Sequence, residues 1–240
     1  LSKTNILLNN FTLNHLERSK LLNFVERRIK QEPFQYIINY APFYGRDFYV
    51  NSNVLIPRPE TETIINILKS ENIYYRHALD IGTGSGNLAI TISLENLASD
   101  IIAIEKSLKA VEIAKKNAAY YNIFNIKFLN RDFILNFINS TFDLIVCNPP
   151  YISIEEYSQL ESTVKNYEPI DALTDFKDGL FFYKHIQKSL PSILNKNGIV
   201  LLEIGLEKHI NQINTIFANY STSWYKDYNG NFRVIKISNV

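Results

Sequence analysis

The chain has 240 residues, 46% hydrophobic and 20% charged, so it can bury a substantial core in one domain or in one domain with a small appendage. Lysine and arginine total 25 against 24 acidic residues, and the net charge of +1 excludes a general field for gripping nucleic acid phosphates. The single cysteine, Cys147, excludes an internal disulfide or a cysteine zinc cluster and is typical of a cytoplasmic protein, and no run approaches the roughly 20 apolar residues of a membrane span.

The first predicted element is an amphipathic helix over residues 12–31. Its apolar side chains recur at helical spacing with charged residues on the other face, and Pro33 ends the pattern. The apolar face needs a partner, and a packed helix with a solvated charged face is the favoured interpretation. We assign residues 1–41 to a partial N-terminal helical segment. Because the chain contains no methionine, we expect that Leu1 is not its natural start.

A short hairpin is predicted next. Aromatic and β-branched residues between positions 43 and 56 surround Gly45 and the polar run 51–53, which indicates two short strands and a turn. We expect this hairpin, assigned to residues 42–58, to link the helical segment to the main domain. Proline and acidic residues over 57–62 then indicate the start of a helix.

From residue 75 on, short apolar runs alternate with helical patterns. The runs occupy residues 78–81, 101–104, 126–129, 142–146 and 199–204, and the helical patterns occupy residues 87–94, 108–121, 179–194 and 208–217. Strict alternation predicts a parallel sheet that is covered by helices on both faces. Residues 223–228 and 232–238 flank an Asn-Gly turn, which predicts a terminal antiparallel hairpin in the domain that we assign to residues 59–240.

A glycine-rich loop lies where the first of these strands meets its helix. Gly82, Gly84 and Gly86 alternate with Thr83 and Ser85. Such glycines let the backbone approach a ligand closely and the helix start offers free N–H groups, although glycine turns also occur for geometry alone. A dinucleotide-binding loop would carry a further glycine at position 87, which weakens a pyrophosphate interpretation. The spacing instead resembles the first motif of the S-adenosylmethionine-dependent methyltransferases, which passes under the amino acid part of the cofactor.

Three further side chains lie where such a cofactor would need them. Asp80, just before the loop, would help to orient the cofactor's ammonium group indirectly. Glu105 ends the second strand about 20 residues past the glycines, where a carboxylate can accept hydrogen bonds from both hydroxyls of a ribose. A solvated strand-end acid or a helix cap is the alternative for Glu105. Phe133 follows the third strand, where this superfamily contacts adenine, and a core position is its equal alternative.

Asn148, Pro149, Pro150 and Tyr151 follow the fourth strand, at the edge of an open parallel sheet where ligands bind. The prolines fix the backbone in advance and leave the Asn148 amide and the Pro149 carbonyl as acceptors. Two acceptors that hold both N–H bonds of a planar amino group orient its lone pair towards a methyl carbon, and such positioning can contribute about 7 to 11 kcal/mol. Tyr151 would stack on the flat group. The alternatives are that the two prolines only terminate the strand in a loop and that Tyr151 is an ordinary packed aromatic residue. We interpret Cys147 as a buried strand residue rather than a nucleophile.

Further motifs occur in order along the chain and indicate one family within the S-adenosylmethionine-dependent methyltransferases. They are Pro33-Phe34-Gln35-Tyr36-Ile37, Phe43-Tyr44-Gly45, Val54-Leu55-Ile56-Pro57-Arg58-Pro59-Glu60-Thr61-Glu62, Tyr167-Glu168-Pro169 with Ala172-Leu173, and Leu202-Glu203-Ile204-Gly205. With the glycine loop and the proline turn, they resemble the peptide chain release factor glutamine methyltransferases from about residue 32 to the C-terminus. The proline-arginine-proline run is the most specific of them, because methyltransferases in general do not share it.

The resemblance implies a Rossmann-like class I methyltransferase fold with a seven-stranded, mostly parallel sheet. It implies transfer of a methyl group from S-adenosyl-L-methionine, which leaves S-adenosyl-L-homocysteine, to the side-chain amide nitrogen of the glutamine in the Gly-Gly-Gln motif of a release factor. The cofactor contacts carried over are residues 82–86, Glu105, Phe133 and Asn148, and the glutamine would be held by residues 148–151. Arg58 and Glu60 resemble residues that border this pocket, with an ion pair that pins the hairpin as the alternative. Glu168 and Glu203 would either anchor loops or shape the site.

Two departures from the family pattern are visible. The family usually has aspartate where Glu105 stands, and its N-terminal helical bundle, which helps to grip the release factor as the substrate-recognition part, is represented here by little more than one helix.

Two other functions compete with this interpretation. A nucleic acid amino-methyltransferase needs the same two acceptors and stacking ring for adenine or cytosine, but the near-neutral charge and the lack of an evident target-recognition insertion argue against it. A noncatalytic binding module that retains the fold is the second alternative. We expect a release factor as partner, no specific nucleic acid and no membrane. The four histidines show no metal-ligand spacing, so we assign no metal. The sequence leaves the oligomeric state open, and we expect a monomer.

Overall fold

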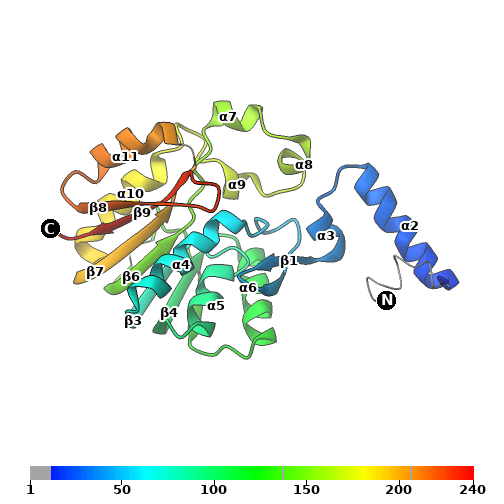
Figure 1. Cartoon of the computed structure of the whole chain (residues 1–240), viewed down its shortest axis with the longest axis horizontal. Helices are drawn as coiled ribbons and strands as arrows, with labels where there is room; N and C mark the ends of the chain where they lie inside the picture. The colour runs from blue at the N-terminus through cyan, green and yellow to red at the C-terminus, as the bar shows by residue number, and fades with distance from the viewer. Residues whose placement is uncertain (1–11, 137, 206) are drawn as a thin grey trace.

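The computed structural model describes residues 12–136, 138–205 and 207–240. Its centre is a seven-stranded sheet in the order β5-β4-β3-β6-β7-β9-β8 (Figure 1). The strands are β3 (Tyr75–Ile81), β4 (Ala98–Glu105), β5 (Ile126–Asn130), β6 (Phe142–Cys147), β7 (Leu194–Glu203), β8 (Ser221–Lys226) and β9 (Phe232–Ser238). Strands β3 to β7 pair in parallel, and β9 runs antiparallel between β7 and β8. The predicted α/β fold with a mostly parallel sheet and a terminal antiparallel hairpin is confirmed.

Helices cover both faces of the sheet, because successive strand residues point to opposite sides. On one face lie α4 (Glu62–Glu71), α5 (Asn87–Leu94) and α6 (Leu108–Tyr120), and on the other lie α10 (Phe181–Ile193) and α11 (Ile210–Ile216). In β6, Leu144 and Val146 pack into the first core, whereas Ile145 and Cys147 pack into the second. Full burial of an aliphatic side chain stabilises a fold by roughly 1.5 to 3 kcal/mol, so the strand that leads to the proline turn is firmly held on both sides.

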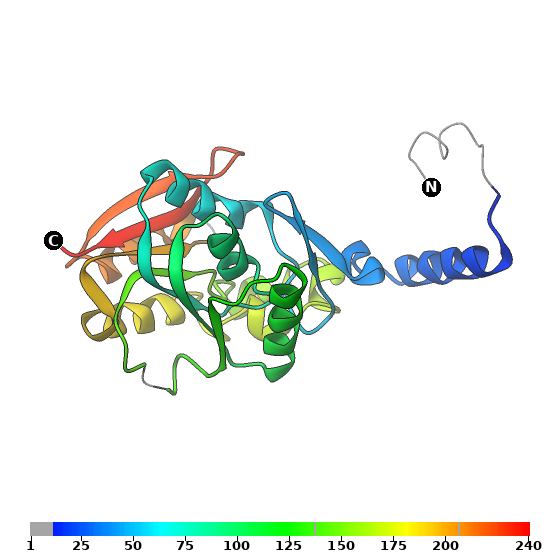
Figure 2. The ribbon, with the colours of Figure 1, turned by 90° about the horizontal axis from the view of Figure 1, so that it is seen from below.

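The N-terminal helix α2 (His15–Ile29) projects from the body of the molecule (Figures 1 and 2). It begins with a capping box in which the Glu17 N–H donates to the Asn14 side chain and the Asn14 N–H donates to the Glu17 carboxylate. The predicted helix is confirmed. None of its residues is buried against the rest of the described chain, and Leu16 and Ile29 are 78% and 75% exposed. The partner that its apolar face needs is therefore not supplied by the described residues.

The hairpin lies earlier in the chain than the sequence suggested. After α3 (Phe34–Ile38), β1 (Tyr40–Phe43) and β2 (Arg46–Tyr49) pair antiparallel across a tight turn. Residues 50–56, which the predicted hairpin includes, are irregular. Their apolar side chains serve packing rather than a sheet, since the cluster that they form with α3 and α6 contains Tyr36, Val50, Val54, Ile56, Ala110 and Ile113.

Short helices that the sequence did not predict fill the connection from β6 to α10. They are α7 (Ile154–Ser158), α8 (Ser162–Lys165) and α9 (Ile170–Leu173), and they gather beyond one end of the sheet (Figure 1). Two single turns of 3-10 helix, η1 (Pro59–Thr61) and η2 (Glu207–His209), precede α4 and α11. Within the described ranges, the helices are too short or too polar to cross a membrane.

Candidate functional site

A cavity of about 760 Å³ lies at the carboxyl ends of β3, β4 and β6. The chain runs outward from β3 in one direction through β4 and β5, while β6 lies on the other side of β3, so the strand order reverses here. Open α/β sheets bind ligands at such a reversal, and small-molecule sites typically measure about 300 to 1,000 Å³. The cavity brings together most of the predicted site residues, namely Gly82, Thr83, Gly84, Ser85, Glu105, Phe133, Asn148, Pro149 and Pro150. The residues predicted to form or border the site that lie outside its lining are Glu60, Gly86, Tyr151, Glu168 and Glu203.

The glycine loop is tied to the neighbouring strand by its backbone. The N–H groups of Gly82 and Thr83 both donate to the carbonyl of Ile104, at 2.9 and 3.0 Å. Gly86 closes the loop with φ +82°, and a Cβ at this position would lie 2.9 Å from Ile90 Cδ1 and 3.2 Å from Ala114 Cβ. Gly86 therefore lets α5 and α6 approach each other, whereas the open side of the loop at Gly82 faces the cavity.

Two carboxylates flank this loop. Asp80 is 1% exposed and accepts a hydrogen bond from Thr83 Oγ1 at 2.6 Å, and burial raises the pKa of its carboxyl to about 7. Glu105 accepts from the Gly84 N–H at 3.2 Å and from the Ser107 N–H at 2.9 Å. Burial raises the pKa of Glu105 above its ordinary value, and these two N–H donors offset part of that rise. The Glu105 carboxylate thus links the glycine loop to the start of α6 beside the cavity.

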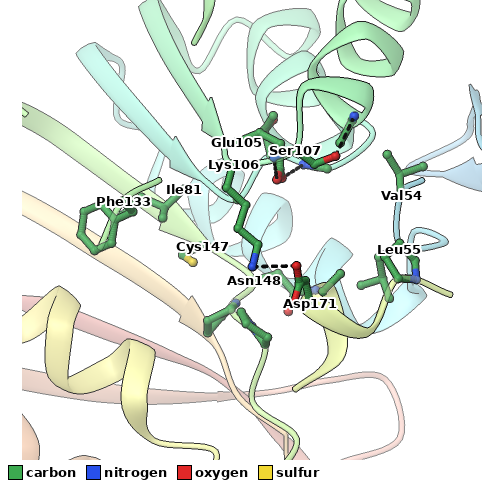
Figure 3. Close-up of a pocket in the computed structure, with 18 of the residues that line it drawn as sticks. Val54, Leu55, Ile81, Glu105, Lys106, Ser107, Phe133, Cys147, Asn148 and Asp171 are labelled. Atoms are coloured by element: carbon green, nitrogen blue, oxygen red, sulfur yellow. Dashed lines mark hydrogen bonds and ion pairs between the residues drawn. The ribbon is translucent and has the colours of Figure 1, made fainter. Parts of the chain in front are cut away.

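Figure 3 shows Glu105, Phe133 and Asn148 around one hollow, although Glu105 ends β4 and the other two follow β5 and β6. Phe133 lines the cavity and also packs against the core of the α10 face, and its contact with adenine stays a prediction. Asn148 is half-buried at the carboxyl end of β6, and its Nδ2 donates to Thr61 Oγ1 at 3.2 Å. Pro149 after it is buried. The turn is therefore fixed both by its backbone and by a side-chain contact to η1.

Tyr151 supports the turn from behind in this structure. Its hydroxyl donates to Glu203 Oε1 at 3.2 Å, and a Cβ added at Gly205 would lie only 2.5 Å from its ring. Burial raises the pKa of the Tyr151 hydroxyl, and the nearby Glu203 carboxylate raises it further. The phenol is thus a neutral hydrogen-bond donor. Its predicted stacking on a substrate stays a prediction.

Ion pairs join loops around the cavity. Lys106 Nζ reaches from the end of β4 to Asp171 Oδ2 of α9 at 3.0 Å (Figure 3). Arg58 lies 2.5 Å from Glu168 Oε1, and the Ile56 N–H donates to the second oxygen of Glu168 at 3.2 Å. Arg58 thus forms an ion pair while it lines the cavity, and Glu168 anchors the loop before α9 to the segment before α4.

Sequence reasoning missed several lining residues, which include Thr61, Thr174, Asp175, Phe176, Phe181 and Phe182. Thr174, Asp175 and Phe176 lie in the stretch after the proline turn, where no periodic pattern marks them, and Phe181 and Phe182 begin α10. Asp175 organises that stretch, because its carboxylate accepts from the N–H groups of Gly179 and Phe181, each at 3.0 Å. Thr61 could have been found, since it lies inside the specific proline-arginine-proline run.

Two chemistries find no support here. Cys147 is buried, and burial raises the pKa of its thiol well above the usual range, so it is not poised as a nucleophile. The residues that the structure describes contain no group of three or more histidine, cysteine, aspartate or glutamate side chains that could hold a metal ion.

Comparison with known proteins shows the relatives of this chain. Residues 59–165 match the family model described as "Methyltransferase small domain". A release factor glutamine methyltransferase from Bacillus subtilis is 36% identical over 92% of this chain and 85% of its own length, and one from Thermodesulfovibrio yellowstonii is 41% identical over 76% and 67%. A bifunctional methyltransferase from Rickettsia bellii is 35% identical over 94% of this chain, which spans 46% of that longer protein.

Solved structures show the same fold at low identity. A methyltransferase from Pyrococcus furiosus superposes with a TM-score of 0.61 at 22% identity, over 93% of this chain and 98% of its own. The N-methyltransferase NodS from Bradyrhizobium japonicum, in complex with S-adenosyl-L-homocysteine, gives a TM-score of 0.52 at 12% identity, over 75% of this chain and 86% of its own. The cavity described above lies within a methyltransferase fold.

Proposed function

This chain belongs to the release factor glutamine methyltransferases, and from that premise we propose that it methylates the side-chain amide nitrogen of the glutamine in the Gly-Gly-Gln motif of a peptide chain release factor. The observation that carries the proposal is the position of Asn148 on the same cavity as the glycine loop and Glu105. The donor would be S-adenosyl-L-methionine and the second product S-adenosyl-L-homocysteine. We place the reaction in the cytoplasm, where translation terminates. We expect the enzyme to act as a monomer.

The lining residues fit this cofactor. The carboxylate of Glu105 has two oxygens for the two ribose hydroxyls, and its longer side chain still reaches the glycine loop through the Gly84 N–H. The backbone at Gly82 leaves room, since an added Cβ would meet no atom within 4 Å, and Phe133 offers a ring for the adenine. When bound, S-adenosylmethionine supplies an electrophilic methyl group on its sulfur.

Asn148 and Pro149 would hold the substrate. An amide nitrogen is a weak nucleophile, because its lone pair is delocalised into the carbonyl group. Oδ1 of Asn148 and the carbonyl oxygen of Pro149 can accept the two N–H bonds of the glutamine amide, which aims its lone pair and accommodates the positive charge that develops on nitrogen. Tyr151 and Pro150 are proposed to complete the contacts to the glutamine. The rival substrate, an amino group of a nucleic acid base, is not favoured, because the curated relatives over most of the chain are release factor glutamine methyltransferases.

Mass spectrometry tests the proposal directly. A release factor is incubated with this protein and S-adenosylmethionine and then digested, and we expect the mass of one CH2 group on the Gly-Gly-Gln peptide. A release factor with alanine in place of that glutamine should gain nothing. Methylation of the alanine variant, or of nucleic acid alone, would contradict the assigned substrate.

The role of Asn148 is tested with a matched pair. Asn148→Ala should abolish methyl transfer while it largely preserves release factor binding. Asn211→Ala, on the exposed side of α11, should behave as the wild-type protein. Unchanged activity of Asn148→Ala in a radiolabelled methyl assay would refute the assigned role.

A further inference from the structure

A buried carboxylate lies behind the proline turn, and the proposed reaction has not used it. Glu203 ends β7 and is 1% exposed. One of its oxygens accepts from Thr61 Oγ1 at 2.5 Å, and the other accepts from the Tyr151 hydroxyl at 3.2 Å. Both donors are neutral hydroxyls that come from different parts of the chain. A charge buried this deeply is costly unless hydrogen bonds hold it, so its presence calls for a purpose.

The hydrogen bonds run in one direction from Asn148 to Glu203. A threonine hydroxyl has a single proton, and the ionised Glu203 carboxylate can only accept, so in this ionised form the contact assigns that proton to Glu203. Thr61 Oγ1 can then only accept from its other neighbour. That neighbour is Nδ2 of Asn148, at 3.2 Å, which has the N–H needed to donate. The order of donors is therefore fixed by the carboxylate at its end.

This order decides which end of the Asn148 amide remains for a ligand. With Nδ2 turned to Thr61, Oδ1 is the amide atom left to accept an N–H bond from the cavity. A rotation of the amide by half a turn would present an N–H group there instead, and two N–H groups facing each other cannot bond. The rotation is disfavoured because Oδ1 would then meet a Thr61 hydroxyl whose proton is already committed to Glu203.

We propose that Thr61 and Glu203 are positioning residues that keep the Asn148 amide oxygen, rather than its NH2 group, turned to the substrate. The inference rests on the proposed function, since it assigns Asn148 the task of accepting an N–H bond from the glutamine amide. Neither residue needs to touch the substrate for this effect. Tyr151 supports the same arrangement through the second oxygen of Glu203.

Surrounding groups keep Glu203 in place. Arg233 of β9 donates to the carbonyls of Ile204 and Gly205 at 3.1 and 3.0 Å, which brings its positive charge next to the carboxylate. The Tyr183 hydroxyl donates to the Glu203 carbonyl at 2.8 Å. The side chain is thus held by η1 and by the proline turn, and its backbone is held by α10 and by β9.

The first test compares substitutions of similar size at Thr61. Thr61→Val removes the hydroxyl, and we expect kcat to fall about tenfold or more, while the affinity for S-adenosylmethionine measured by calorimetry stays within about threefold. Thr61→Ser keeps the hydroxyl and should restore most of kcat. Thr63→Val, a buried threonine two positions along in α4, is the matched control and should leave kcat unchanged.

A second pair of variants tests Glu203, at the other end of the hydrogen bonds that run from Asn148 through Thr61. Glu203→Gln can still accept from Thr61 through its amide oxygen and should retain more activity than Glu203→Met, which cannot accept at all. This pair keeps the test decisive if Thr61→Val fails to fold. A loss in Glu203→Gln as large as that in Glu203→Met would overturn the inference.

A readout without turnover separates this inference from the proposed function. In the free protein, the side-chain NH2 protons of Asn148, observed by NMR with ¹⁵N-labelled asparagine, should exchange with water more slowly in the wild type and Thr61→Ser than in Thr61→Val. If the wild type leaves release factors unmethylated, the proposed function fails and the exchange rates still test the hydrogen-bond order. If the wild type is active but Thr61→Val matches Thr63→Val in kcat and in exchange, the positioning role is refuted.

Discussion

The Arg58–Glu168 ion pair gives a prediction whose size follows from the burial of its two partners. Glu168 is 2% exposed as a side chain and Arg58 is 31% exposed, at a separation of 2.5 Å. Removal of one partner of a buried pair costs about 3 to 5 kcal/mol, because the other charge is left uncompensated. Water reaches the guanidinium group and screens the pair, and the Ile56 N–H continues to hold Glu168. We therefore expect Arg58→Met to lower the free energy of unfolding by about 2 to 3 kcal/mol.

Urea denaturation measures this loss, and the chain offers a matched control. The pair between Lys106 and Asp171 is 42% and 53% exposed and also reaches the segment around α9. Exposed pairs contribute about 0.2 to 1 kcal/mol, so Lys106→Met should cost no more than that. The double variant Arg58→Met/Glu168→Gln should recover part of the loss, because the buried charge is gone. Equal losses in Arg58→Met and Lys106→Met would refute the reasoning from burial.

Three further predictions follow from contacts at the site. Gly205→Ala would place a Cβ 2.5 Å from the Tyr151 ring, so overpacking should cost about 1 to 3 kcal/mol and lower the thermal midpoint; a wild-type midpoint would show that the turn moves freely. Burial raises the pKa of both Asp80 and Glu203 to about 7 from ordinary values of 3.8 and 4.5, so between about pH 4.5 and 7 the folded chain binds more protons than the unfolded one. Stability from these two groups is therefore complete below their unfolded pKa and is lost as the pH rises through about 7, and denaturation of Glu203→Gln across this range should show a flatter decline than the wild type. Glu105→Ala should raise the dissociation constant for S-adenosylmethionine by about tenfold or more, since hydrogen bonds to a charged group contribute about 1.5 to 3 kcal/mol, and an unchanged calorimetric value would contradict the ribose contact.

The central sheet could be predicted because its strands are buried on both faces and therefore appear as largely apolar runs. In residues 142–146, for example, Leu144 and Val146 pack into one core, Phe142 and Ile145 pack into the other, and Asp143 is the one polar position. The glycine loop, Glu105 and Asn148 could be placed together because the carboxyl ends of parallel strands meet at one edge of the sheet. Chain order and local pattern were sufficient for these residues.

The contacts that link distant segments could not be predicted in the same way. Thr61 meets Glu203 across 142 residues of chain, and Arg58 meets Glu168 across 110. Such pairs depend on the strand order and on the path of the loop after the proline turn, neither of which leaves a periodic signal. The predicted bounds of the hairpin are wrong for a related reason. The apolar residues 50–56 pack against helices and do not pair with another strand. The stacking role of Tyr151 stays a prediction.

Because Cys147 is buried, alkylation of its thiol can report how often the structure around it opens. This thiol, the only one in the sequence, lies in β6 opposite Ile81 of β3 and Leu202 of β7, at the middle of the sheet and one residue before Asn148. Cys147 is 1% exposed although it lines the cavity, so the rate of alkylation follows the transient opening of the structure around it. A ligand that binds the folded chain alone would slow that modification in proportion to its occupancy, which provides an affinity measurement without a catalytic assay.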